Sequence, residues 1–289
     1  MIDSAHRLRG VVLFLIALLL FACLDATAKY MSAFFAVPLL VWARYMVHCV
    51  FMLVTVAPSL GRELVVTRHP WLMTVRALLL VGVTLLGQLA LKTLPLAETT
   101  ALVFVTPLLV ALLAGPMLGE KVPGRAWIAT LAGFGGVLLI ARPGGAMAGT
   151  GIVYALGAAL CYAFYQILTR KLAGREHPLR LLFTTALGGT VAMAFALFTH
   201  WDGTWPTWTQ AALIASLGLY GGVGHFCLIR AFRDAPVSTL APLLYVQLIW
   251  ATLLGWLVFS HLPDIAAVAG MAVIGASGLA LALPARRQA

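Results

Sequence analysis

Long apolar runs alternate with short polar breaks along the whole 289-residue chain. Most of these runs are about 20 residues long, the length that an α-helix needs to cross the hydrocarbon core of a bilayer. The breaks carry proline, glycine or charge, as in the turn Arg142-Pro143-Gly144-Gly145. The pattern predicts ten transmembrane helices, near residues 8–30, 36–57, 71–92, 96–118, 125–140, 151–172, 179–200, 208–233, 236–259 and 264–283.

The composition excludes a water-soluble globular protein. Apolar residues make up 62% of the chain and charged residues 10%, whereas a typical soluble domain is about 25% charged. So few charges cannot cover a surface that faces water. Ten helices take up about 200 residues, so the remainder holds no separate soluble domain.

The net charge of +10 is sorted by side of the membrane, which argues against a nucleic-acid partner. With the N-terminus inside, fifteen of the 19 basic residues fall on the inner side, Arg76 among them. Both termini are therefore predicted to be cytoplasmic. The alternative is a signal peptide, since Arg7 and Arg9 precede an apolar stretch that ends near Cys23.

The two halves of the chain align at an offset of 141 residues, which also argues against a cleaved leader because the first helix then has a partner. Polar positions inside the spans coincide in this alignment, including Asp25 with Gln166 and Thr84 with His225. Five helices per unit is an odd number, so the second copy enters the membrane inverted. The predicted fold is an all-α integral membrane protein, a five-plus-five inverted-topology repeat of units 1–145 and 146–289, with its site near the midplane.

Charged side chains within the spans mark the bundle interior, because exposure to hydrocarbon costs a few kcal/mol or more. Asp25 and Lys29 lie one turn apart on the first helix, where they can pair. Arg44 and His48 have the same spacing on the second helix. Asp25 and Arg44 either lock two helices together or act on the solute, and Asp25, Arg44 and His48 are candidates for a charge or proton relay. Further proton carriers are Glu98 and His225.

Uncharged polar and aromatic positions supply the candidate binding site. Several share a helical face, such as Thr84 with Gln88, while His225 borders a stripe of glycines. Each has an ordinary alternative, since a lone histidine often only packs and tyrosine or tryptophan near a span end anchors the helix. The predicted substrate-binding residues are Thr84, Gln88, Thr106, Tyr162, Tyr165, Gln166, His225, Gln247 and Trp250.

Proline and small residues suggest where the helices bend and pack. Pro107 and Pro242 are predicted to bend the fourth and ninth helices, unless the membrane helix simply tolerates them. The fifth and tenth helices carry small residues, Gly136 and Gly270 among them, which favour close packing against neighbours or in a homodimer. The four cysteines stand apart from one another, so neither a metal site nor a disulfide nor a bound cofactor is expected.

Three stretches at helix junctions carry a recognisable pattern. They are residues 92–102 running into Thr106-Pro107-Leu108, then Gly119-Glu120, and residues 231–237 running into Ala241-Pro242-Leu243. With these motifs the whole chain resembles the EamA branch of the drug/metabolite transporter superfamily. One departure is Ser260-His261, which stands where the second copy usually repeats Gly-Glu. The resemblance implies ten helices in a bacterial inner membrane and export of small metabolites, and the aromatic stripe suggests YddG-type amino acid exporters.

The function expected from these features is secondary transport. A solute would bind in a central cavity that opens alternately to each side, driven by its own gradient or a coupled ion, because no P-loop is present. Amino acids, aromatic ones among them, fit the candidate residues, and a flavin, a nucleoside or another cofactor-like metabolite fits them as well. The other classes considered are an intramembrane enzyme, which lacks a catalytic constellation here, and a channel.

Overall fold

The computed structural model describes residues 4–119, 124–142, 149–172, 175–235 and 240–282, and within these ranges it contains helices and no strand. The elements are α1 (Ser4–Met31), α2 (Val37–Thr55), α3 (Ala57–Leu60), η1 (Gly61–Leu64), α4 (Pro70–Thr93), α5 (Leu96–Val103), α6 (Thr106–Leu118), α7 (Gly124–Ala141), α8 (Gly149–Leu172), α9 (Pro178–Ala192), α10 (Ala196–Thr199), α11 (Trp208–Asp234), η2 (Ala241–Tyr245), α13 (Val246–Phe259) and α14 (Ile265–Ala282).

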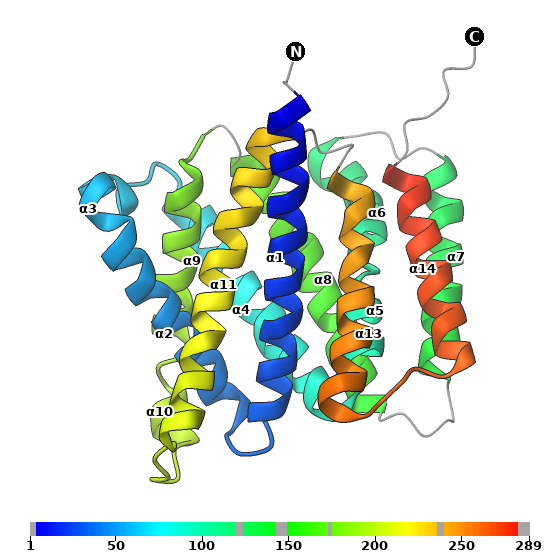
Figure 1. The fold of residues 1–289 in the computed structure, drawn as a ribbon. Coiled ribbons are helices and arrows are strands. Elements are labelled where there is room, and N and C mark those ends of the chain that lie inside the picture. The colour runs from blue at the N-terminus through cyan, green and yellow to red at the C-terminus, as the bar shows by residue number, and fades with distance from the viewer. Residues whose placement is uncertain (1–3, 120–123, 143–148, 173–174, 236–239, 283–289) are drawn as a thin grey trace.

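The helices form a bundle suited to a membrane. Seven segments are long and apolar enough to cross a bilayer, and three shorter apolar helices lie at Trp127–Ala141, Leu243–Phe259 and Ile265–Ala280. The long helices run side by side, and α1 begins at the same end of the bundle where α14 finishes (Figure 1). The protein is therefore a multi-pass helical membrane protein, while the count of ten spans stays a prediction.

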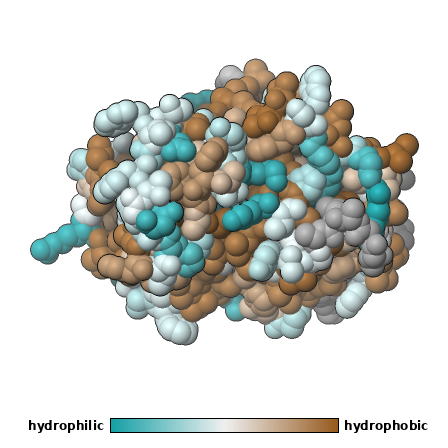
Figure 2. All heavy atoms as spheres, turned by 90° about the horizontal axis from the view of Figure 1, so that it is seen from below, coloured by the Kyte–Doolittle hydropathy of each residue, from teal (hydrophilic) through white to brown (hydrophobic). Residues whose placement is uncertain are grey.

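The outer surface of the bundle matches this reading. Large apolar side chains are exposed along the sides, for example Leu131 on α7, Val153 on α8 and Ile249 on α13. The end opposite the start of α1 instead carries many hydrophilic and intermediate side chains among hydrophobic ones (Figure 2). Apolar sides suit contact with lipid, and polar ends suit contact with water.

Local sequence sets where several helices start. Thr207 and Gln210 form a capping box at the start of α11, in which each side chain bonds the other residue's backbone N–H. A proline occupies the first turn of α2, α4 and α9, where its missing N–H costs no helical hydrogen bond.

Three helices that the sequence predicts as continuous are divided in the structure. The predicted helix 96–118 is split between α5 and α6, with Pro107 in the first turn after the break. The predicted helix 179–200 becomes α9 and the single turn α10, and Pro242 of the ninth helix lies in the 3-10 segment η2. At the first break Thr106 Oγ1 donates to Val103 O at 2.6 Å, which stabilises a turn that proline cannot continue as regular helix.

Helix pairing follows the glycines. Helix α1 packs along α11, α8 packs along α4, and α2 and α9 pack against each other. A Cβ added at Gly218 of α11 would lie 2.5 Å from Val47 Cβ, and one at Gly224 would lie 2.7 Å from Phe21. The glycine stripe beside His225 is therefore covered by side chains of α1 and α2.

Helices α7 and α14 pack closely against each other at their glycines. A Cβ added at Gly136 would lie 2.7 Å from Gly270 O, and one at Gly270 would lie 2.6 Å from Gly136 O. The small residues thus bring two helices of the same chain into backbone contact. A homodimer through these helices stays a prediction.

The connections before α4 and between α8 and α9 meet at Glu176, whose side chain is buried. Its carboxylate accepts hydrogen bonds from Thr67 Oγ1 at 2.6 Å and from Arg180 Nη1 at 2.5 Å, and His69 Nδ1 lies 3.3 Å away. Burial on its own would raise the pKa of Glu176, but these hydrogen bonds outweigh it and lower the pKa to about 2. The carboxylate therefore joins the two connections in its ionised form.

We expect Glu176→Gln to lower the free energy of unfolding at pH 7 by about 2 kcal/mol, because hydrogen bonds to a charged group are lost. The folded pKa lies below the unfolded value near 4.3, so this stabilisation is complete above about pH 5 and is lost as the pH falls towards 2. Unfolding temperatures measured in detergent from pH 7 to pH 4 test this. Glu63→Gln, at an exposed position of η1, is the matched control. A Glu176→Gln protein with the wild-type pH dependence would contradict the assignment.

Candidate solute-binding site

Two histidines meet inside the bundle where α2 and α11 pack. The rings of His48 and His225 are nearly parallel, with centroids 6.4 Å apart, and Phe21 of α1 lies 5.0 Å from the His225 ring. His48 is buried, and its Nε2 has no hydrogen-bond partner among the described residues. The structure thus brings together two residues predicted from separate halves of the chain.

Arg44 lies close to this histidine pair. Arg44 is within electrostatic range of Asp25, His48 and His225. No described group makes a hydrogen bond or an ion pair within 4.0 Å to either Asp25 or Arg44. The lock between Asp25 and Arg44 that the sequence left open is therefore not formed here.

Lys29 corrects a second expectation. Its ammonium does not pair with Asp25 but donates to the backbone oxygens of Leu91 and Leu94, the latter at 2.6 Å. These carbonyls belong to the last turn of α4 and the residue after it, where no further helical N–H is available to them. An amine near a helix C-terminus interacts favourably with such carbonyls, which explains why Lys29 turns away from Asp25.

Arg76 is the main residue of this region that the sequence reading missed. The charge distribution places Arg76 among the basic residues of the inner side, but the residue is buried, with 3% of its surface exposed. Its guanidinium donates to Tyr165 OH at 2.6 Å, Thr169 Oγ1 at 2.7 Å, Thr185 Oγ1 at 2.9 Å and Leu181 O at 3.0 Å. Its place two turns into an apolar helix was the available signal.

The aromatic residues of α8 lie next to this guanidinium. The rings of Tyr162 and Tyr165 stack with centroids 5.8 Å apart, and Arg76 Cζ lies 4.4 Å from the Tyr165 ring centroid. A cation over a tyrosine face is attracted by the ring quadrupole. Arg76 therefore fixes Tyr165 both through its hydroxyl and through its ring.

On α4, Thr84 and Gln88 have different surroundings. Thr84 Oγ1 lies 2.8 Å from the hydroxyl of Tyr45, a residue that the sequence reading did not single out. Tyr45 OH also donates to Leu80 O at 2.9 Å, so Thr84 serves the contact between α2 and α4. Gln88 is buried one turn further along, and within the described part of the chain neither its Oε1 nor its Nε2 has a hydrogen-bond partner. Among these residues Gln88 keeps unused hydrogen-bonding capacity.

The described contacts of the histidine pair include none of the other predicted binding residues. Thr106 stabilises the break between α5 and α6, and Trp250 packs against apolar side chains of α1 and α11. Gln247 is buried on α13 and Gln166 partly buried on α8. Their role in binding stays a prediction.

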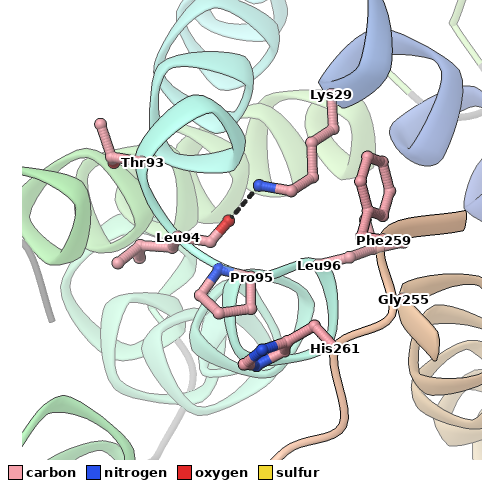
Figure 3. Close-up of a pocket in the computed structure, with 8 residues that line it drawn as sticks. All are labelled: Lys29, Thr93, Leu94, Pro95, Leu96, Gly255, Phe259 and His261. Carbon is pink, nitrogen blue, oxygen red and sulfur yellow. Dashed lines mark hydrogen bonds between the residues drawn. The ribbon is translucent and has the colours of Figure 1, made fainter.

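A recess of about 260 Å³ opens at the end of the bundle where α1 finishes. Figure 3 shows Lys29 pointing to the Leu94 carbonyl on one side of the recess, with Phe259 and His261 contributed by the second half of the chain. His261 Nε2 lies 3.2 Å from Glu98 Oε1. Glu98 is buried, and no described group forms a hydrogen bond with its other carboxylate oxygen. His261, which replaces an expected acidic residue, thus contacts an acidic residue of the first half.

These features define a class of protein. Charged, imidazole and phenol groups are held inside an apolar helical bundle, as in membrane proteins that move a polar solute. Among the described residues, no group of three or more His, Cys, Asp or Glu side chains could hold a metal ion.

The chain belongs to the EamA-like transporter family, which matches it twice, over residues 8–142 and 149–283. The resemblance inferred from the helix-junction motifs is therefore confirmed at the level of the family. A solved crystal structure matches 94% of this chain and 96% of its own with a TM-score of 0.67 and 20% identity, which shows the shared fold.

Curated relatives match nearly the full length of the chain. An S-adenosylmethionine uptake transporter of Rickettsia bellii is 25% identical over 92% of this chain and 90% of its own. A riboflavin transporter of Vibrio cholerae is 26% identical over 93% and 91%, and one of Rhizobium johnstonii is 26% identical over 91% and 87%. The protein is thus similar to transporters of small metabolites.

Proposed function

We propose that this protein is a secondary transporter of a cofactor-like metabolite that carries a planar heteroaromatic ring. The observation that carries the proposal is the near full-length similarity to transporters named for S-adenosylmethionine and for riboflavin, both of which contain such a ring. The relatives favour this solute class over the export of amino acids. The named relatives do not support the narrower match to YddG-type amino acid exporters.

The polar interior supports the same solute class. The stacked pair Tyr162 and Tyr165 offers aromatic surface, and the unbonded nitrogens of His48 and Gln88 offer hydrogen bonds. Aromatic faces with a few polar groups suit a ring-bearing solute of low net charge. Asp25, His48 and His225 then supply the titratable groups that ion coupling requires, and Arg44 supplies a fixed positive charge.

We also propose that the chain works as two inverted five-helix units that open alternately to the two sides. Two matches to one family, one in each half, support an internal repeat. The helix pairs support it as well, because α1 with α11 and α8 with α4 exchange under the 141-residue offset. With the N-terminus inside, the distribution of basic residues supports cytoplasmic termini in a bacterial inner membrane.

Uptake into proteoliposomes tests the function. We expect saturable uptake of radiolabelled S-adenosylmethionine or riboflavin, and weaker uptake of phenylalanine and methionine. Saturation separates a carrier from a channel, and an imposed pH gradient separates coupled from facilitated transport. Absence of saturable uptake of every ring-bearing cofactor would refute the proposal.

Removal of one stacking ring gives a sharper test. We expect Tyr162→Ala to weaken binding of the transported solute about tenfold, since a stacking contact contributes about 1–3 kcal/mol. Val153→Ala, at an exposed position of the same helix, is the matched control and should leave affinity unchanged. Scintillation proximity binding to purified protein measures both. If the two variants bind the solute with equal affinity, Tyr162 does not contribute to the binding site.

A further inference from the structure

Two opposite charges lie at a similar depth in the bundle. Asp25 is six residues before the end of α1 at Met31, and Arg44 is seven residues after the start of α2 at Val37. At a rise of 1.5 Å per residue these positions lie about 9 Å and about 10 Å from the same end of the bundle. Both side chains are partly buried, on helices joined by a short connection.

Neither charge has a bonded partner within the described chain. No nitrogen of Arg44 lies within the 4.0 Å ion-pair distance of the Asp25 carboxylate, and no hydrogen bond reaches either group. The nearest cation on the same helix, Lys29, is bound to backbone oxygens. Ions removed from water need such partners, because the desolvation cost amounts to several kcal/mol for each ion.

The neighbours of the Arg44 side chain belong to α11 and α2. Arg44 lies against Gly221 of α11, because a Cβ added at Gly221 would be 3.6 Å from Arg44 Nε. Arg44 Cζ lies 5.9 Å from the centroid of the Tyr45 ring. Asp25 and Arg44 still interact electrostatically. The carboxylate and the guanidinium therefore lie within electrostatic range of each other without forming an ion pair.

We propose that Asp25 and Arg44 bind the zwitterionic, α-amino-acid end of the solute, with its ammonium group on Asp25 and its carboxylate on Arg44. This inference rests on the proposed function and narrows it to ring-bearing solutes that carry an amino-acid group. A lone anion would satisfy only Arg44 and leave Asp25 unpaired, and a lone cation would do the reverse. A zwitterion satisfies both charges without changing the net charge of the site.

The experiment pairs a change in the protein with a change in the ligand. Binding of S-adenosylmethionine, its decarboxylated analogue, adenosine and riboflavin is measured on purified wild-type protein, Asp25→Asn and Arg44→Gln. We expect the wild type to bind S-adenosylmethionine at least about tenfold more tightly than adenosine. Arg44→Gln should weaken S-adenosylmethionine by about tenfold and leave the decarboxylated analogue unchanged, whereas Asp25→Asn should weaken both. Arg62→Gln, at an exposed position, is the control, and size-exclusion chromatography confirms that each variant is folded.

The outcomes separate this inference from the proposed function. If Arg44→Gln weakens binding of S-adenosylmethionine and of its decarboxylated analogue equally, Arg44 has a structural role and the inference is overturned. Wild-type binding of adenosine or riboflavin as tight as that of S-adenosylmethionine would also overturn it, while the proposed function would stand. Tight binding of a ringless amino acid such as methionine, lost in both variants, would support the zwitterion site and overturn the ring-bearing solute class.

Discussion

Replacement of Arg76 by lysine is expected to lower the free energy of unfolding by about 3 kcal/mol, the range found when a buried charge loses its partners. The guanidinium joins three helices, because it sits on α4 and donates to Tyr165 and Thr169 of α8 and to Thr185 of α9. Lysine keeps the charge but not the planar fork, so it cannot reach these acceptors together. The apparent unfolding temperature in detergent should fall by about 8 °C.

Transport should fall together with stability in the Arg76→Lys protein, because Tyr165 loses both its hydrogen bond and the cation over its ring. Arg62→Lys, an exposed position on η1, controls for the substitution itself. An Arg76→Lys protein as stable as the wild type, with unchanged uptake, would show that the charge alone matters at this position.

Gly136→Ala is expected to destabilise the protein by about 2 kcal/mol, because overpacking of a tight contact costs about that much. The new Cβ would stand 2.7 Å from Gly270 O and 2.9 Å from Ile274, so α7 and α14 would have to move apart. Thermal unfolding in detergent measures the effect.

Gly135→Ala is the matched control for this prediction. It is the preceding residue of the same helix, and nothing lies within 4 Å of the Cβ that it would add. Alanine has the higher helix propensity, so this variant should be neutral or more stable by up to about 1 kcal/mol. Equal destabilisation by the two substitutions would contradict the assigned contact between α7 and α14.

The hydrophobic pattern accounts for the helices better than for the site. Apolar runs of the right length predict membrane helices because each span must satisfy its own backbone hydrogen bonds and present apolar side chains to lipid. The same pattern does not show where a span divides, as at α5 and α6, because a Thr106 hydrogen bond and a proline decide this locally.

The candidate site shows the same division. His48 and His225 were chosen because polar groups in a span usually face the interior, and the structure brings their rings together. The same rule selects Trp250, which packs against apolar side chains of α1 and α11, and its role in binding stays a prediction. Helical spacing assigns a residue to a face of its own helix, whereas the neighbour of that face depends on how the helices are arranged.

The sequence alone determined that the chain is a helical membrane protein of the EamA family, since composition, span length and junction motifs are local properties. Only the tertiary structure decided which polar groups are already bonded. Lys29 and Arg76 find their partners on other helices, whereas Asp25 and Arg44 find none among the described residues. The physical reason is that a hydrogen bond needs two groups within about 3 Å, and residues distant in the chain reach that distance only through packing.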